Sequence, residues 1–262
     1  MKIINLVEKR LYKKNIILGV FVISIVVMLN GCGFKLTIGN ADKKDDTNTT
    51  VSQQREVEYS KDELLPLGTV VLLKDSNRQL MITGRMRKLE GDSSEKIWDY
   101  SGCEYPRGFM SPQDSYLFNI DQIEKVYFKG YEDEEEFEYR SKISEEKITN
   151  SGKTSITKAS KDSIEDVSND KNELLPLGSI VTFEGTNKKV IIIGRIEHLK
   201  GDDSDKIYDY AGCIYPEGSV SANSNYLFDA ALINKVYFKG YQDEKEIEYN
   251  KQLIKYRESL KK

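Results

Sequence analysis

The chain contains the same segment twice. The stretch that begins KDELLPLG at Lys61 recurs as KNELLPLG at Lys171, and the match continues without a gap to Tyr139 and Tyr249. The offset is 110 residues throughout, and 42 of the 79 aligned positions are identical. Such a duplication restricts the fold to two copies of one unit. Each copy has about 80 residues, enough to fold alone but with a limited core.

The remaining segments differ from the repeats in composition. The segment between them has few large apolar residues, no aromatic residues and no sustained periodicity, so we predict a flexible linker. The segment before Lys61 has a similar composition. We therefore divide the chain into a signal peptide (1–31), a membrane tether (32–60), repeat domain 1 (61–142), a disordered linker (143–170) and repeat domain 2 with a C-terminal helix (171–262).

The N-terminus has the pattern of a targeting segment. Five basic residues precede an apolar run of 14 residues from Ile16 to Leu29, which is the length of a signal-peptide core and short for a membrane span. The run ends in Leu29-Asn30-Gly31-Cys32, which resembles the lipobox of bacterial lipoproteins. Cleavage before Cys32 and lipidation of its thiol would anchor the chain. An uncleaved transmembrane helix is the alternative. Both place the bulk of the chain on the extracytoplasmic face of the cell membrane.

The charge of the chain argues against nucleic acid as a partner. The full sequence has a formal charge of −4, and residues 1–31 contribute +4, so the part that follows carries −8. Nucleic acid binding favours basic surfaces. An acidic chain also gains nothing from anionic lipids, so the predicted lipid must provide the attachment to the membrane.

The repeats have the pattern of short strands. Residues 67–74 and 79–87 are apolar and rich in β-branched residues, and a turn at Asn77 or Asn187 would join them in a hairpin. A third strand is predicted to end at the Tyr-Pro pair. A short strand and a helical turn capped by Asn119 or Asp229 follow, and then a strand with Val126 and Phe128 facing inward. An acidic tail closes each repeat. In repeat 2 it continues into a predicted helix, with an apolar face formed by Ile247, Ile254 and Leu260.

We therefore predict a mainly β or α+β fold class with two small repeated domains. Each is expected to be a short-stranded, curved sheet with a C-terminal helix. An SH3-like barrel is one form that such a sheet could take, and a more open α+β arrangement is the other.

Cys103 and Cys213 occupy equivalent positions in the stretches DYSGCEYPRG and DYAGCIYPEG. Three interpretations remain open. Each cysteine could be a small buried residue beside a glycine, the two could form a disulfide between the repeats, or they could be reactive thiols. A reactive thiol needs electropositive surroundings, and acidic residues flank both cysteines.

No catalytic or metal-binding pattern recurs in both repeats. The only histidine, His198, is replaced by Lys88 in the first repeat, so a histidine-based site cannot be duplicated. The loops GDSSE and GDDSD are typical of solvated turns. We predict no enzymatic activity, no cofactor and no metal. A cell-wall hydrolase that uses carboxylates such as Asp92, Asp99 and Asp133 is the enzymatic alternative.

Shared arginine, aspartate and tyrosine residues are the candidates for a contact surface, because arginine and tyrosine are enriched in interface hot spots. A structural role is the alternative, with arginine–aspartate pairs and half-buried tyrosine rings. The candidate binding residues are Arg85, Asp99, Tyr100, Tyr105, Arg195, Asp209, Tyr210 and Tyr215.

The motifs ELLPLGSIVTF, IIIGR, DYAGCIYPEG, YLF and KVYFKGYQDE together resemble the bacterial family known as domain of unknown function 4176. Members of that family occur in Gram-positive bacteria, often in gene neighbourhoods of type VII secretion systems, and have no agreed activity. The resemblance implies a protein-binding accessory factor whose partner is a secretion component or an exported effector. Two tethered copies would raise avidity. An immunity lipoprotein that captures a toxin is the alternative, and a structural spacer is a third.

Overall fold

The computed structural model describes residues 4–5, 57–88, 96–111, 114–148, 173–198, 206–221 and 224–260. Cys32, the apolar run 16–29 and most of the predicted linker lie outside the described residues. Among the helices that are described, none has the length and apolar character needed to cross a membrane.

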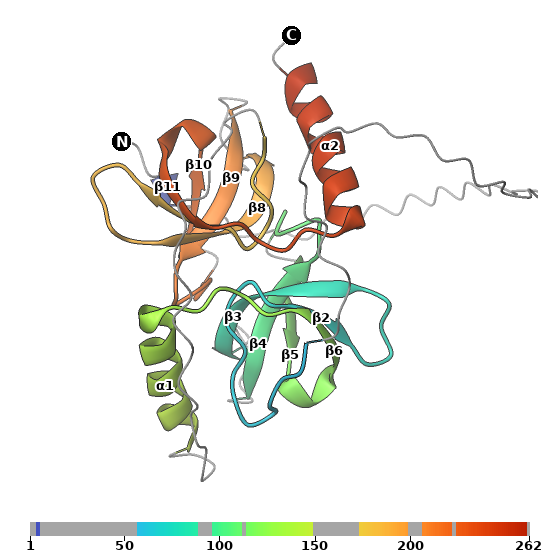
Figure 1. Cartoon of the computed structure of the whole chain (residues 1–262), viewed down its shortest axis with the longest axis vertical. Coiled ribbons are helices and arrows are strands. Elements are labelled where there is room, and N and C mark those ends of the chain that lie inside the picture. Colours follow the sequence, from blue (N-terminus) through green and yellow to red (C-terminus); the bar gives the residue numbers. More distant parts are fainter. Residues whose placement is uncertain are drawn as a thin grey trace, which may run out of the picture. The chain divides into compact units, whose positions relative to one another are not determined.

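Each repeat folds into a five-stranded antiparallel sheet followed by a helix (Figure 1). Repeat 1 has the strand order β5-β4-β3-β2-β6, and repeat 2 has the equivalent order β10-β9-β8-β7-β11. The two-residue strand β1 (Ile4–Asn5) pairs with β10. The elements of repeat 1 are β2 (Val70–Leu73), β3 (Gln79–Lys88), β4 (Ile97–Glu104), β5 (Tyr116–Phe118), a 3-10 turn (Ile120–Gln122), β6 (Ile123–Phe128) and α1 (Glu134–Ile148). Those of repeat 2 are β7 (Ile180–Phe183), β8 (Val190–His198), β9 (Ile207–Ile214), β10 (Asn225–Phe228), a 3-10 turn (Ala230–Leu232), β11 (Ile233–Phe238) and α2 (Glu244–Ser259).

The predicted fold class is confirmed, but the barrel option is wrong. In repeat 1 the outer strands β5 and β6 are the two ends of the strand order and do not pair with each other, so the sheet stays open. The predicted hairpins form, with Val70 opposite Met81 in the first. Their left-handed residues are Asp75 (φ 57°) and its counterpart Gly185 (φ 77°). The prediction had placed this conformation at Asn77 and Asn187.

Both acidic tails fold into helices. Asp133 and Asp243 cap them, because their carboxylates accept hydrogen bonds from the backbone N–H groups of Glu136 (3.0 Å) and Glu246 (2.9 Å). The helix predicted to close repeat 1 is α1, and it continues to Ile148, past the boundary placed at residue 142.

The predicted apolar face of α2 is only partly correct. Ile247 and Ile254 are half-buried, whereas Leu260 is 42% exposed. The most deeply buried residue of α2 is Glu246. A charged side chain, rather than an apolar stripe, therefore forms the deepest contact of this helix.

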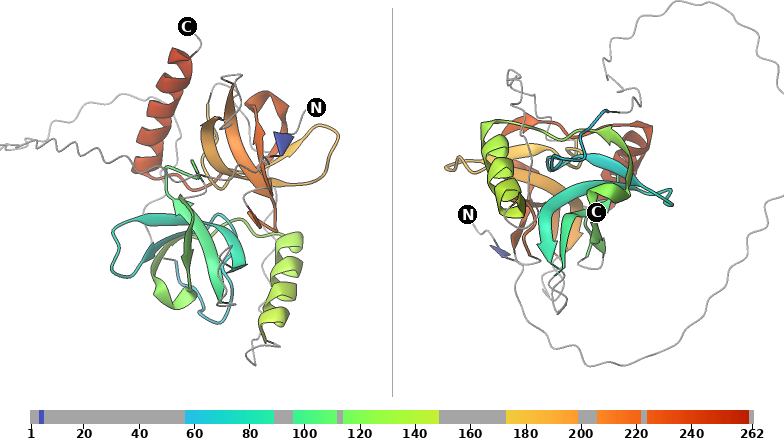
Figure 2. Two further views of the ribbon diagram at one scale, coloured as in Figure 1. Left: turned by 180° about the vertical axis from the view of Figure 1, so that it is seen from behind. Right: turned by 90° about the horizontal axis from the view of Figure 1, so that it is seen from below.

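The two repeats pack against each other around one shared hydrophobic core. The equivalent rings of Phe128 and Phe238 stack on each other with their centroids 5.9 Å apart. Backbone hydrogen bonds cross the interface in matched pairs, from Phe109 N to Ile193 O (2.8 Å) and from Ser219 N to Thr83 O (2.9 Å). Contacts between equivalent positions define a pseudo-twofold axis. The helices α1 and α2 lie on opposite sides of the paired sheets (Figure 2).

This packing changes the interpretation of the duplication. Tethered repeats that act independently would each keep a core of their own. Here the core residues of both repeats form a single cluster, so the tandem is one folded body and the repeats do not provide two separate contacts.

Candidate functional site: the junctions between the repeats

A buried arginine lies at each of the two junctions between the repeats. The guanidinium of Arg85, on β3, forms a bidentate pair with the carboxylate of Glu136, with Nη2 lying 2.9 Å from Oε2. The same Nη2 donates to the carbonyl oxygen of Pro216 in the other repeat at 2.8 Å. The ring of Tyr139 lies 5.4 Å from the guanidinium. Arg85 thus joins its own sheet, its own helix and the other repeat.

Arg195 makes the equivalent set of contacts in repeat 2. It pairs with Glu246 at 2.5 and 2.9 Å, and its Nη2 donates to the carbonyl oxygen of Pro106 at 2.9 Å. The side chains of both partners are fully buried. A buried ion pair requires all its hydrogen bonds to offset desolvation, and the bidentate geometry together with the proline carbonyl supplies most of them.

The backbone next to each arginine is unusual. Met86 and Ile196 have left-handed φ angles of 53° and 55°. This conformation is costly for a β-branched residue such as isoleucine. It recurs in both repeats directly after the buried arginine. We infer that the left-handed residue after each arginine helps to direct the arginine side chain toward the helix.

The predicted arginine–aspartate pairs are replaced, because Arg85 and Arg195 pair with glutamates, and Asp209 lies 3.5 Å from Arg257 of α2 instead. The carboxylates of Asp99 and Asp209 accept hydrogen bonds from the backbone N–H groups of Ile120 (2.9 Å) and Ala230 (2.8 Å). They stabilise the 3-10 turns and are half-buried. Glu136 and Glu246, the true partners, were missed by the sequence reasoning. The sequence did contain a signal for them, because a glutamate occupies the equivalent position in both acidic tails, EDEEEFEY and QDEKEIEY.

The predicted tyrosines hold the fold together. The hydroxyls of Tyr100 and Tyr210 accept hydrogen bonds from the backbone N–H groups of Leu65 and Leu175, both at 2.9 Å. The hydroxyls of Tyr105 and Tyr215 cross the interface, each donating to a backbone carbonyl oxygen of the other repeat, at Tyr241 (3.0 Å) and Tyr131 (2.9 Å) respectively. The Tyr-Pro peptide bonds that follow Tyr105 and Tyr215 are both cis.

Six of the eight candidate binding residues are therefore in the interior, and the contact surface in which they take part is internal. Only the two aspartates are partly exposed. The six lie at 4% exposure or less, so little of their surface is available to a separate partner, although Tyr215 also lines the groove described below. The six are Arg85, Tyr100, Tyr105, Arg195, Tyr210 and Tyr215.

Cys103 and Cys213 are free and fully buried, so the disulfide alternative is wrong for this structure. The thiol of Cys103 donates to the carbonyl oxygen of Ile193 in the other repeat, at 3.9 Å. Burial raises the pKa of Cys103 to about 12 and also raises that of Cys213. Both thiols stay protonated at neutral pH, which does not favour the reactive-thiol interpretation.

The other chemical candidates are dispersed. His198 is exposed at the end of β8, and Asp133 caps α1 and pairs with Lys189. Asp92 and the GDSSE and GDDSD loops lie outside the described residues. Within the described part of the chain, no group of three or more histidine, cysteine, aspartate or glutamate side chains is placed to hold a metal ion.

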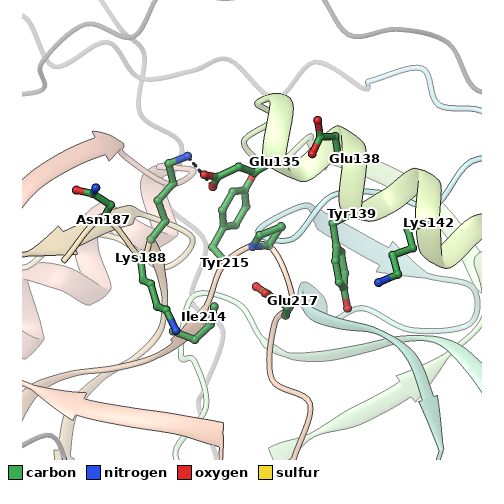
Figure 3. A pocket seen from close by; sticks show the side chains of 11 residues that line it. Glu135, Glu138, Tyr139, Lys142, Asn187, Lys188, Ile214, Tyr215 and Glu217 are labelled. Atoms are coloured by element: carbon green, nitrogen blue, oxygen red, sulfur yellow. Dashed lines mark hydrogen bonds and ion pairs between the residues drawn. The ribbon is translucent and has the colours of Figure 1, made fainter.

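A groove of about 540 Å³ lies at one junction, between α1 and the loops of repeat 2 (Figure 3). Three carboxylates and three lysines line it, together with two tyrosine rings and the residues Asn187, Ile214 and Pro216. The charged residues are Glu135, Glu138, Lys142, Lys188, Lys189 and Glu217. Balanced charge of this kind suits a surface or peptide that also carries both signs, and it does not favour a strongly anionic ligand.

The other junction has different residues at the positions equivalent to those in the groove. The buried arginine, glutamate and tyrosine residues are the same at both junctions, whereas most positions that line the groove have changed. The replacements are Lys245 for Glu135, Gln252 for Lys142, Arg78 for Lys188, Gln79 for Lys189, Glu104 for Ile214 and Arg107 for Glu217. The two junctions thus share a framework but differ in surface chemistry.

The comparisons with known proteins agree with the duplication. No curated protein and no solved structure matches the chain. The model of the family described as "Domain of unknown function (DUF4176)" matches twice, over residues 64–139 and 174–249. Each match runs from the segment before the first strand of a repeat into the first turns of its helix, and together they cover more than half of the chain. The chain belongs to this family and carries its domain in tandem.

Proposed function

We propose that the protein is a membrane-anchored surface lipoprotein that acts as a non-enzymatic, protein-binding accessory factor linked to type VII secretion. The observation that carries the binding role is the groove at the α1 junction. Its charged lining has diverged from the equivalent positions of the other junction, while the buried framework has not. A partner bound in this groove would therefore meet side chains that the other junction does not offer.

The proposed contact is single and asymmetric. Because the repeats share one core, they cannot act as two independent binding modules, and the avidity expected of tethered copies does not apply. One groove that carries three acidic and three basic side chains favours one protein partner per chain, with complementary charges of both signs. The family membership and the lipobox-like sequence before Cys32 support a secretion-linked partner outside the membrane.

The partner is sought by co-purification. A lipid-free ectodomain, residues 33–262, is incubated with surface and secreted proteins of its own cell. We expect it to retain a secretion component or an exported effector. The double variant Lys142→Glu, Lys188→Glu reverses two exposed groove charges and is expected to reduce that retention at least tenfold, since charge reversal at an interface opposes binding.

The matched control changes the equivalent positions of the other junction. The variant Arg78→Glu, Gln252→Glu also adds exposed negative charge and is expected to retain the partner as the wild type does. Equal loss in both variants, or the absence of any secretion-linked protein from the wild-type sample, contradicts the proposal. Retention of a toxin domain that inhibits growth would identify the immunity role instead.

The membrane anchor is tested separately in the full-length chain. The variant Cys32→Ser removes the only thiol that the lipobox-like sequence offers for acylation. We expect this variant to lose the acyl chains, which can be followed by incorporation of a labelled fatty acid. Continued labelling of the variant would contradict lipidation at Cys32, and an unlabelled wild type would support the transmembrane alternative.

A further inference from the structure

The two repeats carry opposite charges where they meet. Arg87, on β3 of repeat 1, donates to the carbonyl oxygen of Glu217 in repeat 2 at 3.3 Å. Both residues act electrostatically on the hydroxyl of Tyr139 from α1. At this junction an arginine of the first repeat therefore lies beside a glutamate of the second.

The pseudo-twofold axis produces the complementary arrangement at the other junction. The counterpart of Arg87 is Glu197, and the counterpart of Glu217 is Arg107. Arg195 donates to the carbonyl oxygen of Pro106, which brings the residue after it, Arg107, next to β8. Both Arg107 and Glu197 act on the hydroxyl of Tyr249. Repeat 1 thus supplies arginine at both junctions, and repeat 2 supplies glutamate.

A second set of positions also differs between the repeats, with the cations on the other side. Lys189 of repeat 2 lies 2.7 Å from the carboxylate of Asp133 and 2.9 Å from that of Glu135, both in repeat 1. At the equivalent place of the other junction, Lys245 of repeat 2 donates to the side-chain oxygen of Gln79 in repeat 1 at 3.3 Å. Here repeat 2 supplies the cations at both junctions.

Pairing two identical repeats would bring like charges together. Two copies of repeat 1 would place Arg87 beside Arg107 at both junctions. Two copies of repeat 2 would place Glu197 beside Glu217. They would also place Lys189 beside Lys245. Like charges in a partly buried interface oppose association. The uncharged contacts, such as the stacked phenylalanines, would form equally well between two identical repeats.

We propose that the charges at the interface select one partner, so that repeat 1 pairs with repeat 2 in preference to a second copy of itself. The partner that this surface fits is a repeat with acidic residues at the positions of Arg87 and Arg107. The chain satisfies that requirement internally, which closes the surface to identical repeats of neighbouring molecules. This inference does not depend on the proposed function.

The test reproduces the like-charge arrangement within the full chain. The half-swap Arg87→Glu, Arg107→Glu places acid beside acid at both junctions. We expect its thermal unfolding midpoint to fall by about 5 °C or more, and the fall to shrink in 1 M salt as the charges are screened. The full swap, which adds Glu197→Arg and Glu217→Arg, restores opposite charges and is expected to regain most of the loss.

Two controls separate charge from packing. The neutral variant Arg87→Gln, Arg107→Gln removes the same cations without creating repulsion and is expected to be less damaging than the half-swap. The variant Lys61→Glu, Lys74→Glu makes the same change in net charge at exposed sites and is expected to unfold at the wild-type temperature. The proposal is overturned if the full swap is no more stable than the half-swap, including the case in which neither folds, or if the neutral variant is equally damaging.

Discussion

Replacing Glu246 by alanine is expected to lower the free energy of unfolding by about 3–5 kcal/mol. The change leaves the guanidinium of Arg195 buried without its counter-ion, because the side chains of both partners are fully buried. Chemical denaturation measures the loss. Hydrogen exchange is expected to show that the amides of α2 lose protection first, since Glu246 is the most deeply buried residue of that helix.

Two companion variants identify the cause. The exposed neighbour Glu248 is on the same helix, and Glu248→Ala is expected to change the free energy of unfolding by less than about 0.5 kcal/mol. The double variant Arg195→Met, Glu246→Leu removes both charges and is expected to be far more stable than Glu246→Ala, because no charge is left unpaired. A double variant as unstable as the single one would contradict an explanation based on the uncompensated arginine.

The substitution Gly240→Ala is expected to destabilise the chain by more than about 3 kcal/mol, at the upper end of what overpacking costs. A methyl group at this position would overlap the carbonyl oxygen of Leu177 and approach the backbone of Gly178. That backbone cannot move freely, because Gly178 N donates to Ile192 O. Thermal and chemical unfolding both report the loss.

Gly185→Ala is the matched control for this steric effect. Gly185 has a φ of 77°, but nothing lies within 4 Å of the position of the added methyl group. We expect a cost of only about 1 kcal/mol, from the left-handed backbone alone. If Gly240→Ala were as mild as Gly185→Ala, the close approach between the two backbones would have no energetic significance.

The strands could be predicted because their signal is local. The apolar runs, the Tyr-Pro pair and the Asn119 and Asp229 turns fixed the order of the elements, and the duplication fixed their number. The contact that holds the helix α1 could not be predicted in the same way. The sequence of this helix is strongly acidic, and its deepest contact is a buried carboxylate, Glu136. Apolar periodicity does not reveal that a helix is held in place by a buried ion pair.

The site was less accessible to sequence reasoning than the fold. Arg85 and Arg195 were selected as candidate binding residues, but the carboxylates that pair with them lie 51 residues further along the chain, so the nearer aspartates were favoured. The groove combines α1 of one repeat with loops of the other. The hydrophobic periodicity of one repeat reports only the local structure of that repeat. It does not show that the two repeats pack together, because the contacts that join them come from residues far apart in the sequence.

The stacked pair Phe128 and Phe238 marks an axis about which two equal subunits could have assembled, and joining them in one chain has a genetic consequence. In an assembly of identical subunits, every substitution is made twice and alters both junctions at once. In the fused chain a substitution near Lys188 leaves Arg78 untouched. One junction can therefore accumulate changes that suit a partner while the other keeps the body folded, a freedom that a symmetric pair of single-domain chains does not have.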